Sequence, residues 1–555
     1  MNEKSESQNP NNIAAAVVAS LVCIVCLFSN LGAIGLVGPD EPRFVWIARA
    51  MATTSDWVTP RLYGTPWFEK PILYYWAAAI GFRLHFSAEW AARLPSALAA
   101  LSASSAVAWL GWKHYGARNG LTRSPALLAP IIFSTSVAAI AFARAATPDM
   151  LFAAAITLAM ASASEVLRRT SALRAQETVS ASDRNPDFVT VSLFGVFLGF
   201  SVLAKGPAGV ILAGGAVGLW ALLTQKWHQA LRLVHPAAVA AFCFIAVPWY
   251  LICALRNPEF INVFIFQHNF ERYLTPVFQH KQPFSFFGPI TILALLPWSA
   301  FLAGSLWEGV RLWREKTWLS SPGFFFCCWA VFPVMFFSLS QSKLPSYILP
   351  AIPALALVAS VGGIRAFERR GKLAIAIAAG TAFVWTALAI YLLHAVRGAP
   401  VNSALHVSEY SFAAILLAAA VIATALIVAG YRRGLPLAIA ICCLAVVATL
   451  GAANIMLLPE LDPAISARPY AELLQNDLHP DRIFEFRVKR SWNYGLAFYF
   501  RRELPEWSPE DREAALVLTT REGFQKIVQE GRFHGNLEQE PQGGLLYVPI
   551  EPAPR

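Results

Sequence analysis

The sequence predicts an all-α polytopic membrane protein with a small soluble α/β domain at its C-terminal end. Hydrophobic residues make up 56% of the 555 residues and charged residues only 14%, whereas a soluble protein carries about 25% charged residues. Apolar runs long enough to cross a bilayer, which takes about 20 residues, recur from Ile13 to Leu458. The chain is therefore not a string of soluble domains.

The first apolar run follows a polar N-terminal segment and lacks a small-x-small cleavage site, so we expect it to be retained as a membrane span. The sequence predicts about 13 transmembrane helices in all, on the criterion of bilayer-spanning length. They are expected at residues 13–36, 90–112, 124–142, 148–167, 189–205, 207–224, 236–255, 288–307, 322–340, 347–364, 373–395, 411–430 and 435–457.

Clusters of lysine and arginine between these runs set the orientation, because cytoplasmic loops are enriched in basic residues. The clusters lie at 113–123, 168–184, 226–232, 311–316, 365–372 and 432–433. Counting the apolar stretch Pro71–Phe86 as a span would place every one of them outside. We therefore predict that it is a helix at the membrane surface, where Arg83 and His85 suit the interface. The N-terminus is then inside and the C-terminus outside.

Residues 459–555 differ in composition from the rest of the chain. Strand-like runs at Arg482–Val488, Ala515–Thr519 and Leu545–Ile550 alternate with helix-like runs at Ala464–Asn476 and Arg521–Gln529. We predict two domains: a transmembrane domain at 1–458, with outer loops 37–89 and 256–287, and a soluble domain at 459–555. The eight cysteines lie in or beside apolar runs, so no disulfide framework is expected.

Charged residues gather in the predicted outer loops, and each has a structural and a functional interpretation. Asp40 and Glu41 stand at a membrane boundary, where carboxylates are costly unless paired or functional, but Asp40 could equally cap a helix starting near Pro42. Glu69 and Lys70 could be interfacial anchors, or ligands of a sugar, metal or phosphate.

The other outer segments are similarly ambiguous when they are taken one at a time. Asp149 could be only an N-terminal helix charge, and Lys205 could only snorkel to the interface. Gly206-Pro207 would also present a helix N-terminus suited to an anion. His268 alone is weak evidence for a metal, because zinc takes three or four ligands.

Taken together, the outer loops hold carboxylates and cations on one membrane face. Such a set suits a reaction on a phosphate-bearing lipid, with cations on phosphate and carboxylates on sugar hydroxyls or an amine. The carboxylates are Asp40, Glu41, Glu69 and Asp149, and the cations are Arg43, Lys70, Arg144, Lys205, Arg256, Arg272 and Lys343.

These motifs, in this order, resemble the GT-C glycosyltransferases that use polyprenyl-phosphate sugars, which are related to the protein O-mannosyltransferases. The branch they resemble is the lipid A 4-amino-4-deoxy-L-arabinose transferases. The resemblance covers nearly the whole membrane part and none of residues 459–555. The matching motifs are Asp40-Glu41-Pro42-Arg43, Tyr63 with Phe68-Glu69-Lys70-Pro71, Lys205-Gly206-Pro207, and the segment from Ser342 to Pro350.

The resemblance implies transfer of aminoarabinose from undecaprenyl phosphate to lipid A phosphate at the periplasmic face of a bacterial inner membrane, giving polymyxin resistance. It implies an inverting enzyme without a nucleotide or organic cofactor, with zinc as the favoured metal and Glu69 and His268 as its ligands. It also implies a monomer that binds membrane lipids and no nucleic acid. The catalytic residues would be Asp40, Lys70 and Asp149. The substrate-binding residues would be Arg43, Glu41, Glu69, Tyr63, Tyr74, Lys205, Arg256, Arg272, Lys343 and Tyr347.

Within that reaction, the acceptor phosphate is already an anion and needs no strong general base. Stabilising the charge of the leaving phosphate would be the main catalytic task, assigned to Lys70, Arg43 and Lys205. Three alternatives stay open. They are a related transferase acting on a hydroxyl with Asp40 as base, a lipid-linked sugar transporter without catalysis, and a sensor that uses the outer motifs as scaffold.

Overall fold

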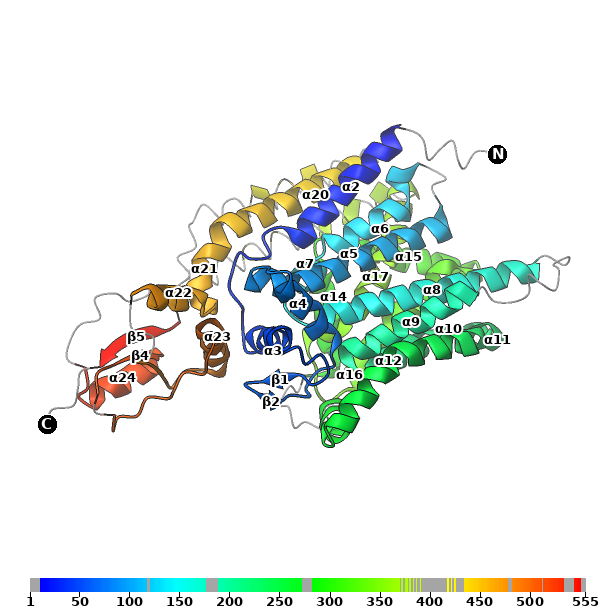
Figure 1. The fold of residues 1–555 in the computed structure, drawn as a ribbon. Helices are drawn as coiled ribbons and strands as arrows, with labels where there is room; N and C mark the ends of the chain where they lie inside the picture. The colour runs from blue at the N-terminus through cyan, green and yellow to red at the C-terminus, as the bar shows by residue number, and fades with distance from the viewer. Residues whose placement is uncertain are drawn as a thin grey trace.

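A computed structural model of the chain describes residues 10–116, 120–175, 188–271, 282–369, 434–477, 482–511, 513–533 and 544–550, with isolated residues between 371 and 425. Long helices run roughly along one another to form the membrane part, and a small domain with a sheet lies at one end (Figure 1). The outer-loop elements α3 (Asp40–Thr54), β1 (Arg61–Leu62) and β2 (Thr65–Pro66) lie at that end, and α11 (Trp227–Ala230) lies at the opposite end.

Within the described residues, eight helical segments are long and apolar enough to cross a membrane, or nine if one bent pair counts as a single span. Their main helices are α2 (Pro10–Phe28), α5 (Ala88–Tyr115), α8 (Asp149–Ala175), α9 (Phe188–Lys205), α12 (Pro236–Arg256), α16 (Pro322–Leu339), α17 (Ile352–Arg369) and α20 (Leu435–Ala452). The bent pair is α6 (Pro125–Ser134) and α7 (Val137–Ala143), which meet at 59°. Shorter helices are α10 (Ala208–Thr224), η4 (Asn262–Glu271), α14 (Phe287–Ala294), α15 (Phe301–Arg314) and η7 (Pro345–Ala351).

The predicted runs and the helices agree in position, but several runs are not single straight spans. The run 124–142 is the bent pair, and 288–307 is split between α14 and α15. The run 207–224 is matched by the shorter helix α10. The predicted spans 373–395 and 411–430 lie largely outside the described residues.

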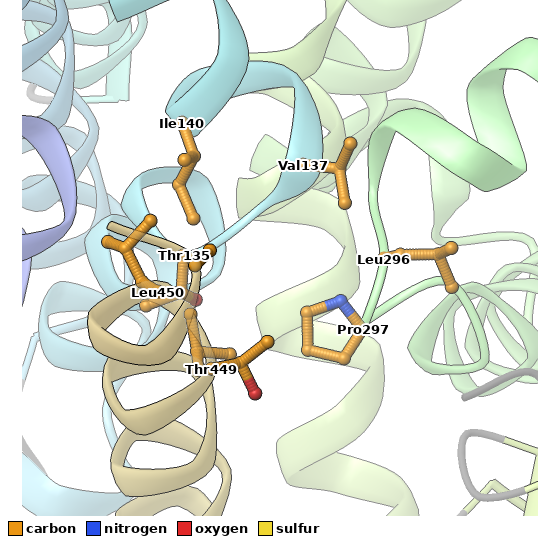
Figure 2. A pocket seen from close by; sticks show the side chains of 9 residues that line it. Thr135, Val137, Ile140, Leu296, Pro297, Thr449 and Leu450 are labelled. Carbon is orange, nitrogen blue, oxygen red and sulfur yellow. The ribbon is translucent and has the colours of Figure 1, made fainter. Parts of the chain in front are cut away.

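The two interruptions meet inside the bundle. The Val137 N–H donates to the Leu296 carbonyl at 3.0 Å, and the Trp298 indole N–H donates to the Thr135 hydroxyl at 2.8 Å. These bonds satisfy polar groups that a broken helix would otherwise leave unpaired in the membrane. Beside them lies an apolar cavity of about 170 Å³ between the interruptions and α20, lined also by Leu450 (Figure 2).

The first outer loop contains α3 (Asp40–Thr54), the short antiparallel pair β1 (Arg61–Leu62) and β2 (Thr65–Pro66), and α4 (Leu73–Arg83). Helix α4 has 11 residues, so it is about 16 Å long, roughly half the thickness of a bilayer core. It cannot span, in agreement with the sequence prediction. Helix α3 starts at Asp40 itself, which corrects the idea that Asp40 caps a helix starting near Pro42.

The C-terminal domain contains a three-stranded sheet in the order β3-β4-β5, with β3–β4 parallel and β4–β5 antiparallel. The strands are β3 (Ile483–Phe486), β4 (Ala515–Thr519) and β5 (Leu546–Ile550), close to the predicted runs. Helix α24 (Arg521–Gln529) has the predicted bounds. The predicted helix 464–476 is instead the end of α21 (Leu458–Ile465) and α22 (Arg468–Asp477), and α23 (Arg490–Phe500) was not predicted.

Helix α23 packs against α3 and anchors the C-terminal domain to the first outer loop. The Tyr499 hydroxyl accepts from the Leu36 N–H and donates to the Glu89 carboxylate, both at 2.8 Å. The Arg49 guanidinium donates to the Phe498 carbonyl at 3.0 Å. Hydrogen bonds thus fix the domain directly to the loop that carries Asp40.

Candidate active site

A cavity of about 440 Å³ opens where the outer-loop elements meet the ends of the membrane helices. Its volume lies in the range of pockets that bind small molecules, about 300–1,000 Å³. The charged and polar lining includes Asp40, Glu69, Lys70, Asp149, Lys205, His268 and Tyr347. The aromatic lining includes Phe44, Phe152, Phe264, Phe336 and Phe337. The structure therefore gathers residues from four of the predicted outer segments, together with His268 and Tyr347, around one space.

Asp40 enters the site on the first turn of α3. Gly38 has φ +67°, a left-handed conformation that glycine adopts without strain, and it turns the chain just before the helix. A carboxylate at a helix N-terminus is electrostatically favourable. One turn later, the Arg43 guanidinium donates to the Asp40 carboxylate at 2.5 Å and lies 3.0 Å from a Glu69 carboxylate oxygen.

Arg43 is 5% exposed and does not line the cavity. Its guanidinium carbon lies 5.4 Å from the ring centroids of both Phe44 and Trp67, and 5.7 Å from that of Tyr494. The Arg43 guanidinium thus contacts two carboxylates while its plane lies near aromatic rings. Arg43 therefore fixes the positions of Asp40 and Glu69 without lining the cavity itself. We predicted that Arg43 contacts a substrate phosphate. In this structure its guanidinium lies outside the cavity lining and is instead bonded to carboxylates.

Lys70 follows Glu69 in the loop after β2 and lines the cavity. Its ammonium lies 3.6 Å from Glu69 Oε1. The neighbouring residue Pro71 removes a backbone donor and fixes the chain before α4. Glu69 thus stands between two cations, one behind the cavity wall and one facing the cavity.

Asp149 and Lys205 form the second charged group of the cavity. Asp149 is in the first turn of α8 and Lys205 in the last turn of α9, and the two side chains are joined by an ion pair. Gly206, at φ +82°, ends α9 immediately after Lys205. The Lys205 ammonium also lies 5.2 Å from the Tyr347 ring centroid, a cation–π distance.

Two residues predicted to bind substrate are structural in this geometry. Glu41 is 8% exposed; its carboxylate accepts from Arg93 at 2.8 Å and from the Val37 and Ala146 N–H groups at 2.9 and 2.7 Å. Tyr74 is buried, and its hydroxyl donates to the Ala92 carbonyl at 2.9 Å. Neither residue lines the cavity, because the polar groups of both are bonded to α5 and to the chain next to it.

Three further predicted residues, Tyr63, Arg256 and Lys343, are not part of the cavity lining. Tyr63 stacks on Tyr494 with a centroid separation of 6.3 Å. Arg256 is exposed and lies 3.5 Å from Asp56. The Lys343 ammonium donates to the Ser340 and Gln282 carbonyls at 2.6 and 3.1 Å, which closes the loop after α16. Arg272 lies outside the described residues.

The predicted metal ligands Glu69 and His268 both line the cavity. A carboxylate and an imidazole are suitable zinc donors, but zinc takes four ligands. The described residues contain no group of three or more histidine, cysteine, aspartate or glutamate side chains that could hold a metal, and Glu69 already faces Arg43 and Lys70. The metal stays a prediction.

Several lining residues were not predicted from the sequence. The Thr147 hydroxyl is buried at the cavity wall without a hydrogen-bond partner among the described residues. Phe264, Phe336 and Phe337 supply an apolar wall. Thr147 stands two residues before Asp149, and this proximity was the available signal. Nothing in the sequence separates the wall phenylalanines from those that face lipid.

Comparisons with known proteins agree with the fold. The family model described as dolichyl-phosphate-mannose-protein mannosyltransferase matches residues 14–264. A relative from Edwardsiella ictaluri, named undecaprenyl phosphate-alpha-4-amino-4-deoxy-L-arabinose arabinosyl transferase, is 30% identical over 321 residues, which is 58% of this chain and 54% of the relative. A relative of the same name from Erwinia tasmaniensis is 31% identical over 327 residues, covering 59% and 55%. The matched region spans just over half the length of these relatives.

Two solved structures match almost the whole chain. The crystal structure of ArnT from Cupriavidus metallidurans bound to undecaprenyl phosphate has a TM-score of 0.75 and 23% sequence identity, over 96% of this chain and 97% of that one. The apo structure of the same protein has a TM-score of 0.73 and 22% identity, over 97% and 98%. The chain therefore has the same fold as these ArnT structures over nearly its whole length, including the C-terminal domain.

Proposed function

We propose that the chain is an integral-membrane glycosyltransferase that moves 4-amino-4-deoxy-L-arabinose from undecaprenyl phosphate to a phosphate of lipid A. The proposal places the reaction at the periplasmic face of the bacterial inner membrane and links it to resistance to cationic peptides such as polymyxin. Its support is the names of the relatives and the fold shared with ArnT.

The observation that carries the proposal is the pairing of charges in one cavity. Asp40, Lys70, Asp149 and Lys205 come from distant parts of the chain and line the same space. Cations can hold a phosphate, and carboxylates can hold sugar hydroxyls or the sugar ammonium. The phenylalanine wall suits the isoprenoid end of a donor lipid, because apolar surface is favourably removed from water.

The proposed reaction exchanges one phosphate ester for another at the sugar C1. An oxygen of the lipid A phosphate attacks C1, the bond from C1 to the donor phosphate oxygen breaks, and undecaprenyl phosphate leaves with the electron pair. No proton has to be removed from the nucleophile. A direct displacement of this kind inverts the configuration at C1.

The geometry suggests a role for each lining charge. Lys70 lines the cavity, and we assign it to the leaving phosphate, where the new negative charge develops. Lys205 would share its charge between Asp149 and a phosphate. Asp40, which is 58% exposed in its side chain, is free to contact the sugar or stabilise positive charge at C1. Arg43 fixes the positions of the Asp40 and Glu69 carboxylates relative to each other.

The orientation follows from the charge distribution of the described residues. Arg168 and Arg169 pair with Glu165, and Arg311 pairs with Glu308, all on the side of the bundle opposite the cavity, where basic residues mark the cytoplasm. The chain is a multi-pass membrane protein whose cavity and C-terminal domain are at the other, periplasmic side.

The test is mass spectrometry of lipid A after incubation with the purified protein and undecaprenyl-phosphate aminoarabinose. We expect a mass gain of one aminoarabinose with the wild type and its loss with Lys70→Ala. Lys113→Ala, in the last turn of α5 at the opposite membrane face, is the matched control and should retain transfer. No gain with the wild type, while another polyprenyl-phosphate sugar is consumed, would overturn the substrate assignment. No turnover of any such donor would favour the transporter.

The match to the mannosyltransferase family model over residues 14–264 favours a second candidate, transfer of a sugar to a hydroxyl. A hydroxyl nucleophile needs a base, and Asp40 would have to supply it. Incubation with a polyprenyl-phosphate hexose and protein or glycolipid acceptors distinguishes the two candidates, because a glycosylated hydroxyl would be the product.

A further inference from the structure

The C-terminal domain brings an aromatic ring to the arginine behind the cavity. Tyr494, on α23, lies with its ring centroid 5.7 Å from the Arg43 guanidinium carbon. The same ring stacks on Tyr63 of the first outer loop at 6.3 Å and an interplanar angle of 22°. A residue more than 400 positions away in the sequence therefore forms part of the wall around Arg43.

Helix α23 lies along α3 with two matching contacts. Tyr494 faces Arg43, and Phe498, one turn further along α23, faces Arg49 with a ring-to-guanidinium distance of 4.0 Å. Residues four apart share one face of a helix, so one face of α23 meets both arginines. The Tyr494 contact matters more for the site, because Arg43 donates directly to Asp40, a carboxylate of the cavity lining.

The hydrogen bonds of Arg43 do not by themselves fix the orientation of its guanidinium plane, so neighbouring rings are needed to restrict it. The same nitrogen, Nη2, contacts both Asp40 and Glu69. Among the described residues, Arg43 is the one donor that the Asp40 carboxylate contacts. If the guanidinium of Arg43 tilts, the Asp40 carboxylate is no longer held in position. Aromatic rings against the guanidinium plane restrict that tilt.

We propose that Tyr494 is a positioning residue for the transfer reaction, and that the C-terminal domain acts through it to hold Arg43 and thereby Asp40. The inference rests on the proposed function for its kinetic readout. The ring, rather than the hydroxyl, carries the effect, because the Tyr494 hydroxyl accepts from Arg490 at 3.3 Å and not from Arg43.

The experiment compares Tyr494→Ala, Tyr494→Phe and Tyr499→Phe in the full-length protein in detergent. Tyr499→Phe is the matched control, because it removes hydrogen bonds that dock α23 to Leu36 and Glu89 and leaves the ring against Arg43 in place. We expect Tyr494→Ala to lower kcat about tenfold with little change in KM, as loss of a cation–π contact at a buried group implies. Tyr494→Phe and Tyr499→Phe should stay within about twofold of the wild type.

A second readout needs no activity. Hydrogen–deuterium exchange at residues 38–45 should rise in Tyr494→Ala and not in Tyr494→Phe. Equal kcat for Tyr494→Ala and wild type, equal losses for Tyr494→Ala and Tyr494→Phe, or unchanged exchange at 38–45 would each overturn the inference. An inactive wild type would instead contradict the proposed function, and the exchange measurement would still decide whether Tyr494 positions this segment.

Discussion

Asp149, in the first turn of α8, forms an ion pair with Lys205, in the last turn of α9, and both side chains line the candidate cavity. Each charge also suits its own helix end, since carboxylates favour helix N-termini and ammonium groups favour C-termini. A substrate phosphate that enters must share Lys205 with Asp149. The pair therefore couples the proposed phosphate contact to the proposed sugar contact.

We expect Asp149→Asn and Lys205→Met each to lower kcat/KM by about 100-fold, the size of a lost electrostatic contact to a developing charge. The double variant should lose little more than either single variant, because residues that act as a unit are not additive. A double-mutant cycle on lipid A transfer measures this. Fully additive losses would contradict the coupling.

Glu41 is expected to be a stability residue although it neighbours Asp40. Its carboxylate pairs with Arg93, which is 3% exposed, and breaking a buried pair from one side costs about 3–5 kcal/mol. Glu41→Gln should therefore lower Tm in detergent, whereas Asp40→Asn should leave Tm unchanged and lower activity. Equal Tm for Glu41→Gln and wild type would show that the buried pair contributes nothing.

These neighbours show why the sequence could locate the site but not sort its residues. Hydropathy and basic loops placed Asp40, Lys70, Asp149 and Lys205 on one face, because spans and their orientation depend on local composition. Whether a side chain enters the cavity depends on long-range partners. Glu41 turns inward to an arginine some fifty residues away, and no local pattern indicates that contact.

Interactions between the domains were equally hidden. Helix α23 has the residues of an ordinary amphipathic segment, and its importance comes from packing on α3 at Tyr494 and Phe498. The broken spans illustrate the same limit. Residues 124–142 form one apolar run, but at the bend Thr135 accepts a hydrogen bond from Trp298 and Val137 donates one to the Leu296 carbonyl, both in a distant segment.

Asp40→Asn distinguishes the two proposed acceptors. With a phosphate acceptor Asp40 orients the sugar, and we expect transfer to fall about tenfold to 100-fold; with a hydroxyl acceptor the loss of a base removes up to about 10⁴-fold. Initial rates with lipid A measure the difference. Asp56→Asn, in the same outer loop but outside the cavity lining, is the control and should stay near the wild-type rate.

The C-terminal domain should be stabilised by neutralising one half-buried acid, Glu485. Burial raises the pKa of Glu485 above its usual value, so the folded domain holds the proton more tightly than the unfolded chain does. The stability contribution of this group is present below the unfolded pKa and is lost as the pH rises through the folded pKa. Glu485→Gln should thus raise Tm at pH 7.5 and leave it unchanged near pH 4. Glu510→Gln, at an exposed residue of the same domain, should do neither.

Zinc content tests the predicted metal independently of activity. Glu69 and His268 share the cavity lining; a zinc ion held by these two donors would have one protein ligand fewer than catalytic zinc sites usually have, and would take its other ligands from water or substrate. We expect protein purified without chelator to carry about one zinc per chain, and expect His268→Ala and Glu69→Gln to lose it, since removing a ligand leaves too few donors. His85→Ala, an exposed histidine of the outer loop, should retain it. Metal-free wild type would refute the prediction, and zinc retained in both ligand variants would assign it to other residues.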